Sequence, residues 1–150
     1  MPGVPEKPPA SILIPTLRPG AYLDVTLESV MGQAAQLGAE VIVIADGPDA
    51  ATEATSARHG AQVVTLPQQR GLNSARNAGI AAARSDLLVF IDQDVQAPPG
   101  WLQAVIAGAR AYPDREVFGG PIRARLEGGP RGCGREPAPI TTLEDRKSVV

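Results

Sequence analysis

Apolar and polar positions along this chain alternate between two patterns. Short runs of apolar residues that end in Pro or Asp predict buried strands, and longer stretches with apolar residues three and four positions apart predict amphipathic helices. A further strand is expected over residues 116–127. The other predicted strands are residues 11–16, 40–46, 62–67 and 86–92, and the predicted helices are residues 21–37, 49–60, 71–85 and 100–112.

This alternation of strands and helices indicates an α/β fold. Strands that are apolar over nearly their whole length are buried on both faces, and intervening helices imply parallel pairing. We therefore expect a doubly wound, mostly parallel sheet with helices on both faces, which is a Rossmann-like architecture. Ligands of such sheets bind beyond the carboxyl ends of the strands, near the point where the strand order reverses. The polar residues that follow strands are thus the first candidates for a site.

Composition is that of an ordinary globular protein of one domain. The chain has 150 residues, of which 43% are hydrophobic, and a formal net charge of −2. This charge provides no basic surface for nucleic acid. No apolar run approaches the length of about 18 residues that spans a bilayer, so no transmembrane segment is predicted and the expected location is cytoplasmic. The single cysteine, Cys133, excludes an internal disulfide.

The two ends of the chain differ in composition from the middle. Residues 1–10 are rich in proline and are expected to be a flexible lead-in, and residues 11–126 hold the predicted domain. Residues 127–150 are rich in Gly, Pro and Arg and have no apolar periodicity. The closing DRKSVV is similar to translated sequencing adapter, and its Lys147 is one of only two lysines. We therefore expect a fragment with a truncated C-terminal half and an artefactual end.

In the stretch LLVFIDQDVQAPPGW, residues 87–101, a hydrophobic run ends in Asp92 and Asp94. In a strand, residues two apart point to the same side, so the two carboxylates would converge while Gln93 points away. Such carboxylates repel each other unless a cation lies between them, and Mg²⁺ or Mn²⁺ is typically held by one or two carboxylates plus phosphate oxygens. The pair predicts a metal site for a diphosphate. The alternative is that the aspartates cap the next turn.

The stretch GLNSARNAG, residues 71–79, predicts an anion site at the start of a helix. Gly71 permits close approach of the backbone, and the N–H groups of a helix N-terminus favour an anion. Asn73 and Arg76 share one helix face, where Arg76 would reinforce that site. In the alternative, Asn73 is an N-cap and Arg76 a solvated surface residue.

Two more polar groups follow predicted strands. Pro15 and Thr16 end the first strand, and Asp46 ends the second. Each group alone is also typical of a turn. Because the topology brings the carboxyl ends of these strands together, we interpret them as parts of one site.

A resemblance to a known family rests on four of these segments. SILIPT, EVIVIADG, GLNSARNAGIAAARSDLLVFIDQDV and PPGWL resemble the nucleotide-binding half of family 2 glycosyltransferases of the GT-A fold, over about residues 10–112. The resemblance implies transfer of a sugar from a nucleotide-diphosphate sugar, with a divalent cation, Mn²⁺ or Mg²⁺, and with inversion at the anomeric carbon. The acceptor, whether glycan, lipid or small molecule, is not indicated. Any membrane association would come from parts outside this chain.

The resemblance also implies roles for single residues and shows departures. The family usually has Tyr-Asn where this chain has Leu17 and Arg18, an aspartate at Ala45 and a serine at Pro48, and these departures concern base recognition. The catalytic base of the family lies in its second half, so no catalytic residue is assigned. By resemblance, Pro15 and Thr16 would lie beside the nucleoside, Asp46 at the base, Arg76 on the nucleotide side, Asp92 at the ribose and Asp94 at the metal and diphosphate.

Two other functions were weighed against a transferase. A nucleotide-binding module without transferase activity, either degenerate or completed by a partner, would keep the same donor site. A dinucleotide-dependent oxidoreductase would need Gly-x-Gly-x-x-Gly after the first strand, where PTLRPGAY stands instead. Because the base is expected in the missing half, we also expect that these 150 residues alone do not transfer sugar.

Overall fold

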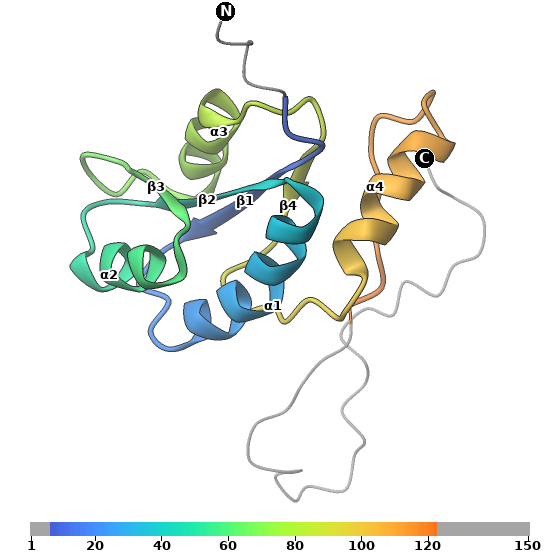
Figure 1. Cartoon of the computed structure of the whole chain (residues 1–150). Helices are drawn as coiled ribbons and strands as arrows, with labels where there is room; N and C mark the ends of the chain where they lie inside the picture. The colour runs from blue at the N-terminus through green and yellow to red at the C-terminus, as the bar shows by residue number, and fades with distance from the viewer. Residues whose placement is uncertain (1–6, 123–150) are drawn as a thin grey trace, which may run out of the picture. The chain divides into compact units, whose positions relative to one another are not determined.

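The structure is a computed structural model that describes residues 7–122, and its helices and strands are labelled in Figure 1. Each element predicted up to residue 112 is present. Only the first strand keeps its predicted bounds; the others are shorter, most of all the third helix and the fourth strand. The strands are β1 (Ser11–Thr16), β2 (Glu40–Ala45), β3 (Gln62–Thr65) and β4 (Leu88–Phe90), and the helices are α1 (Tyr22–Leu37), α2 (Ala50–His59), α3 (Leu72–Ala82) and α4 (Trp101–Ala111).

The four strands form one parallel sheet in the order β3-β2-β1-β4. The chain adds β2 and β3 on one side of β1 and then crosses back to place β4 on the other side. The strand order therefore reverses between β1 and β4, which confirms the predicted doubly wound α/β sheet. By the rule for such sheets, the carboxyl ends of these two strands are where a ligand is expected.

Helices cover both faces of this sheet, as predicted (Figure 1). Successive residues of a strand point to opposite faces, so Ile12 and Ile14 pack with α1 and α4 whereas Leu13 packs with α3. Helix α3 comes so near that a Cβ built on Gly79 would lie 2.8 Å from Cδ1 of Ile44. The absence of a side chain at Gly79 allows this close packing.

The chain divides by its contacts into two units, Met1–Ala111 and Tyr112–Val150, and the sheet with all its helices belongs to the first. Residues 112–122 contain neither helix nor strand. The strand predicted over residues 116–127 is therefore wrong for residues 116–122, where Gly-Gly-Pro interrupts the apolar run and is unsuited to a strand interior. The rest of that segment, and the predicted tail of residues 127–150 with Cys133, lie outside the described residues.

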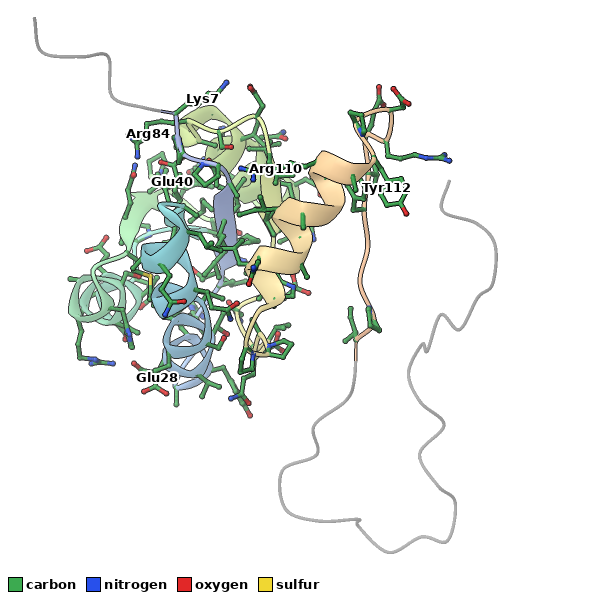
Figure 2. All side chains as sticks on the ribbon, turned by 45° about the vertical axis from the view of Figure 1, so that its right-hand side comes forward. Lys7, Glu28, Glu40, Arg84, Arg110 and Tyr112 are labelled. Atoms are coloured by element: carbon green, nitrogen blue, oxygen red, sulfur yellow. The ribbon has the colours of Figure 1, made fainter. Side chains whose placement is uncertain are left out.

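A buried carboxylate closes the sheet at the amino ends of its strands. Glu40 of β2, whose side chain is 8% exposed, accepts hydrogen bonds from Ser11 Oγ of β1, from the Arg84 N–H (2.7 Å) and from Arg84 Nε (2.8 Å). Figure 2 labels Glu40 and Arg84 at this end of the domain. Burial raises the pKa of Glu40, but these hydrogen bonds outweigh it and hold the pKa below its ordinary value. The network ties β1, β2 and the segment after α3 together.

None of the helices within residues 7–122 is both long enough and apolar enough to cross a membrane.

Candidate functional site

A cleft of about 330 Å³ opens at the carboxyl ends of β1 and β4, where the strand order reverses. It brings together six of the eight residues that the sequence predicted for a site, and only Asn73 and Arg76 are not part of its lining. Its walls come from the ends of β1, β2 and β4 and from the start of α3. The lining consists of Pro15, Thr16, Leu17, Asp46, Gly71, Leu72, Ala75, Asp92, Gln93 and Asp94.

A smaller cavity of about 200 Å³ lies directly beside this cleft. The two share Thr16, Leu17 and Asp46. The smaller cavity is polar, since Asp49, Gln69 and Arg18 also line it. Both cavities therefore lie at the carboxyl ends of β1 and β2.

Asp92 and Asp94 are exposed at the cleft, on the turn that follows β4. Strand β4 ends at Phe90, and the N–H of Val95 donates to the carbonyl of Asp92 at 3.3 Å. The two residues line one cleft from a turn, and the prediction that they lie on one side of a strand is wrong. Neither side chain makes a hydrogen bond or ion pair within residues 7–122. Both carboxylates are thus available to a ligand.

The residue between them, Gln93, differs because its side chain bonds to the backbone of Leu17. Its Oε1 accepts from the Leu17 N–H at 2.8 Å, its Nε2 lies 3.5 Å from the Leu17 carbonyl, and its own carbonyl accepts from Thr26 Oγ1 at 2.8 Å. The turn is therefore attached to the end of β1 and to α1 through its central residue.

Helix α1 holds the rest of the loop between β4 and α4 through two further polar side chains. Ser29 Oγ accepts from the Ala97 N–H at 3.0 Å, and Gln33 donates to the Pro98 carbonyl and accepts from the Leu102 N–H, both at 3.1 Å. With Thr26, these residues share one helix face by their spacing of three and four. This polar face was not predicted from the sequence, although its helical spacing beside the apolar face was a usable signal.

Asp46 is only 6% exposed although it lines both cavities. Its Oδ1 accepts from the Arg70 N–H at 2.7 Å and its Oδ2 from the Gly71 N–H at 2.8 Å. The carboxylate thereby fixes the entry into α3, a role that the sequence analysis did not foresee. Each oxygen keeps a further lone pair, so these bonds leave Asp46 able to accept from a ligand.

The start of α3 lies at the cleft without a side-chain cap. Gly71 occupies the N-cap position with φ of 90° and ψ of 165°, a backbone that glycine adopts with ease. Asn73 is therefore not the N-cap, and that alternative is wrong. The N–H groups of Gly71 and Ser74 are already bonded, to Asp46 Oδ2 and to the Gly71 carbonyl. Those of Leu72 and Asn73 have no partner inside the helix, so this terminus suits an anion. Arg76 is half-buried one turn further along.

The donor set of the cleft fits a hard divalent cation that takes only part of its shell from protein. Residues 7–122 contain no group of three or more His, Cys, Asp or Glu that could hold a metal. Asp92 and Asp94 offer two unpartnered carboxylates instead, and Mg²⁺ is commonly held by one or two carboxylates together with phosphate oxygens and water. These residues fit such an ion in company with a phosphate ligand.

Solved structures share this architecture. TarS of S. aureus, in complex with UDP-GlcNAc, superposes with a TM-score of 0.63 at 21% identity and covers 69% of this chain and 31% of that one, a likeness of fold. Glucosyl-3-phosphoglycerate synthase from Mycobacterium tuberculosis, in complex with Mn²⁺, uridine diphosphate and glucosyl-3-phosphoglycerate, has a TM-score of 0.55 at 26% identity and covers 63% and 37%.

Sequence comparison gives the family. Validoxylamine A glucosyltransferase of Streptomyces hygroscopicus subsp. jinggangensis is 34% identical over 127 residues, which are 79% of this chain and 30% of that protein. The chain thus spans about a third of the length of the relatives it matches or less. The family model of glycosyl transferase family 2 matches residues 11–147, and the chain therefore belongs to glycosyl transferase family 2, with the α/β architecture of its GT-A members.

Proposed function

We propose that this chain is the donor-binding part of a glycosyltransferase that takes its sugar from a nucleotide-diphosphate sugar and depends on a divalent cation. The observation that carries the proposal is the convergence of three elements on one cleft: the end of β1, the uncapped start of α3, and the turn with Asp92 and Asp94. Relatives support it, because one is named a glucosyltransferase and two solved neighbours hold UDP-GlcNAc or Mn²⁺ with uridine diphosphate.

The charge of the cleft explains why a cation belongs to the proposal. Three carboxylates line it, those of Asp46, Asp92 and Asp94, and no Lys or Arg is among its lining residues. A diphosphate brought into such a site without a cation would be repelled. Asp92 and Asp94 would hold the cation, which supplies charge neutralisation for the diphosphate when it is bound.

The remaining lining residues have donor-side roles in this proposal. Pro15 and Thr16 flank the nucleoside, Asp46 accepts from the base beside its two backbone bonds, and Asp92 also reaches the ribose. The N–H groups at the start of α3 face negative charge that grows on the departing diphosphate. All three carboxylates are then used for the donor, so the base that deprotonates the acceptor hydroxyl comes from another part of the protein. We also propose inversion at the anomeric carbon.

Calorimetry with UDP and with GDP, each with and without Mn²⁺, tests the donor site. We expect binding of at least one nucleotide, with an affinity that rises about tenfold or more when Mn²⁺ is present. Asp94→Asn should abolish this increase, because it removes a charged ligand of the cation. Asp114→Asn, which alters an exposed carboxylate outside the cleft, is the matched control and should leave it unchanged. Equal affinity with and without Mn²⁺ would refute the cation, and binding of neither nucleotide would refute the donor site.

A further inference from the structure

Gln93 makes an uncommon pair of contacts for a residue in a surface turn. Its amide group bonds the N–H of Leu17 at 2.8 Å and approaches the carbonyl of the same residue at 3.5 Å, so one side chain serves both backbone groups of one residue. The two residues are 76 positions apart. Leu17 directly follows β1, so this amide joins the ends of the two strands between which the strand order reverses.

A second contact fixes the backbone of the same residue. Thr26 is fully buried in α1, and its hydroxyl donates to the Gln93 carbonyl at 2.8 Å. Gln93 is therefore held at its side chain by Leu17, which directly follows β1, and at its main chain by Thr26 of α1. Its neighbours Asp92 and Asp94 are exposed and have no such contacts within the described residues.

We propose that Gln93 is a positioning residue that sets Asp92 and Asp94 for the cation and the diphosphate, an inference that rests on the proposed function. Fixing the centre of the tripeptide aims both flanking carboxylates into the cleft before a ligand arrives. The entropic cost of ordering the turn then falls on folding and not on binding, which strengthens binding.

The chemistry of the contact favours glutamine at this position. Glutamate could accept from the Leu17 N–H but could not donate to its carbonyl, and it would add a third negative charge to the tripeptide. Asparagine is one methylene shorter and would fall short of Leu17. Methionine keeps the length of Gln93 and offers neither an amide donor nor a carbonyl acceptor, so Gln93→Met removes the contact with little change in volume.

Amide hydrogen exchange on the whole 150-residue chain, without any ligand, tests the contact itself. We expect the Leu17 N–H to be protected in the wild type and to exchange at least about tenfold faster in Gln93→Met. Gln103→Met is the matched control, since Gln103 is exposed on α4 and has no contact with the turn. Unchanged protection of Leu17 in Gln93→Met would overturn the inference, whether or not the chain binds a nucleotide.

Calorimetry with uridine and with UDP plus Mn²⁺ tests the positioning role. Uridine lacks the diphosphate but keeps the ribose that Asp92 is proposed to reach, so its affinity should fall only about two- to threefold in Gln93→Met, whereas the affinity for UDP with Mn²⁺ should fall about five- to tenfold. A parallel loss for both probes, together with a lower melting temperature, would show that Gln93 only supports the fold and would overturn the proposal. If the wild type binds neither uridine nor UDP, both the proposed donor site and the positioning role of Gln93 are refuted. Hydrogen exchange would still show whether the contact of Gln93 with Leu17 exists.

Discussion

Arg18 has a backbone that few residues other than glycine adopt. Its φ of 47° is the only positive value for a non-glycine residue within residues 7–122, and asparagine tolerates this region better than residues with long side chains. We expect Arg18→Asn to raise the free energy of unfolding by about 0.5–1 kcal/mol, measured by urea denaturation. Arg18→Ala serves as the control, because alanine has the same Cβ and should bring no such gain; an equal gain in both variants would contradict the explanation by backbone strain.

Glu40 is a buried charge whose contribution depends on pH. The hydrogen bonds that it accepts from Ser11 and Arg84 lower its pKa in the folded state. The ionised side chain therefore stabilises the fold fully above the pKa of a free glutamate, about 4.3. This stabilisation is lost as the pH falls through the lower pKa of the folded state. Glu40→Gln should lower the free energy of unfolding by about 1–3 kcal/mol at pH 7. The difference from the wild type should shrink below about pH 4.

The matched control for this change is Glu28→Gln. Glu28 lies exposed on α1, as Figure 2 shows, away from Glu40. Denaturation of both variants at pH 7 and at pH 3 separates the two cases. A pH-independent loss in Glu40→Gln would mean that packing, and not the charge, is what the substitution removes.

At the scale of elements, helix α3 depends on its closest point of approach to the sheet. A Cβ at Gly79 would lie 2.8 Å from Cδ1 and 3.0 Å from Cγ1 of Ile44. Gly79→Ala should therefore cost about 1–3 kcal/mol through overpacking, although alanine favours helix. Gly32→Ala in α1 meets nothing within 4 Å and should instead stabilise by up to about 1 kcal/mol. Thermal unfolding of the two variants should show shifts of opposite sign, and stabilisation by Gly79→Ala would contradict the close packing.

The strands and helices could be predicted because their apolar periodicity reflects the core directly. Ile12 and Ile14 face one layer of helices and Leu13 the other, which is what a continuous apolar strand implies. The end of α3 could not be placed, because Ala83 is a good helix former that turns to an extended backbone. The strand expected at residue 116 failed because apolar residues alone do not provide a neighbouring strand.

For the site residues, the sequence predicted their location after strands but not their geometry. Asp92 and Asp94 were found by that rule, but their geometry depends on the contact of Gln93 with Leu17, 76 positions away, which no local pattern encodes. The hydrogen bonds that Asp46 accepts from the N–H groups of Arg70 and Gly71 likewise join residues far apart in the sequence. The roles assigned to these residues toward a nucleotide remain predictions.

At the scale of the whole molecule, β4 is an edge strand of the sheet formed by residues 7–122, and its Phe90 is 43% exposed. An apolar edge strand is a template for pairing with another chain, and a lysine there opposes such pairing. We expect Phe90→Lys to reduce self-association of the chain, measured by light scattering over a concentration series. Val25→Lys adds the same charge at an exposed position of α1 and should reduce self-association less. An equal reduction in both variants would show that net charge, and not the edge strand, controls self-association.

The long sequence separation between Leu17 and Gln93 also determines at which stage of folding the cleft forms. Strand β1 pairs with β2 over a short stretch of chain, whereas its pairing with β4 must close a loop of more than 70 residues, and contacts of long sequence separation carry a larger loop-closure cost. Strands β1 to β3 can therefore assemble while the chain is still being synthesised, and the turn with Asp92 and Asp94 docks afterwards. Because β4 has only three residues, we expect this docking to be lost first under mild denaturation. The proposed donor cleft would then form late in folding and be lost early in unfolding.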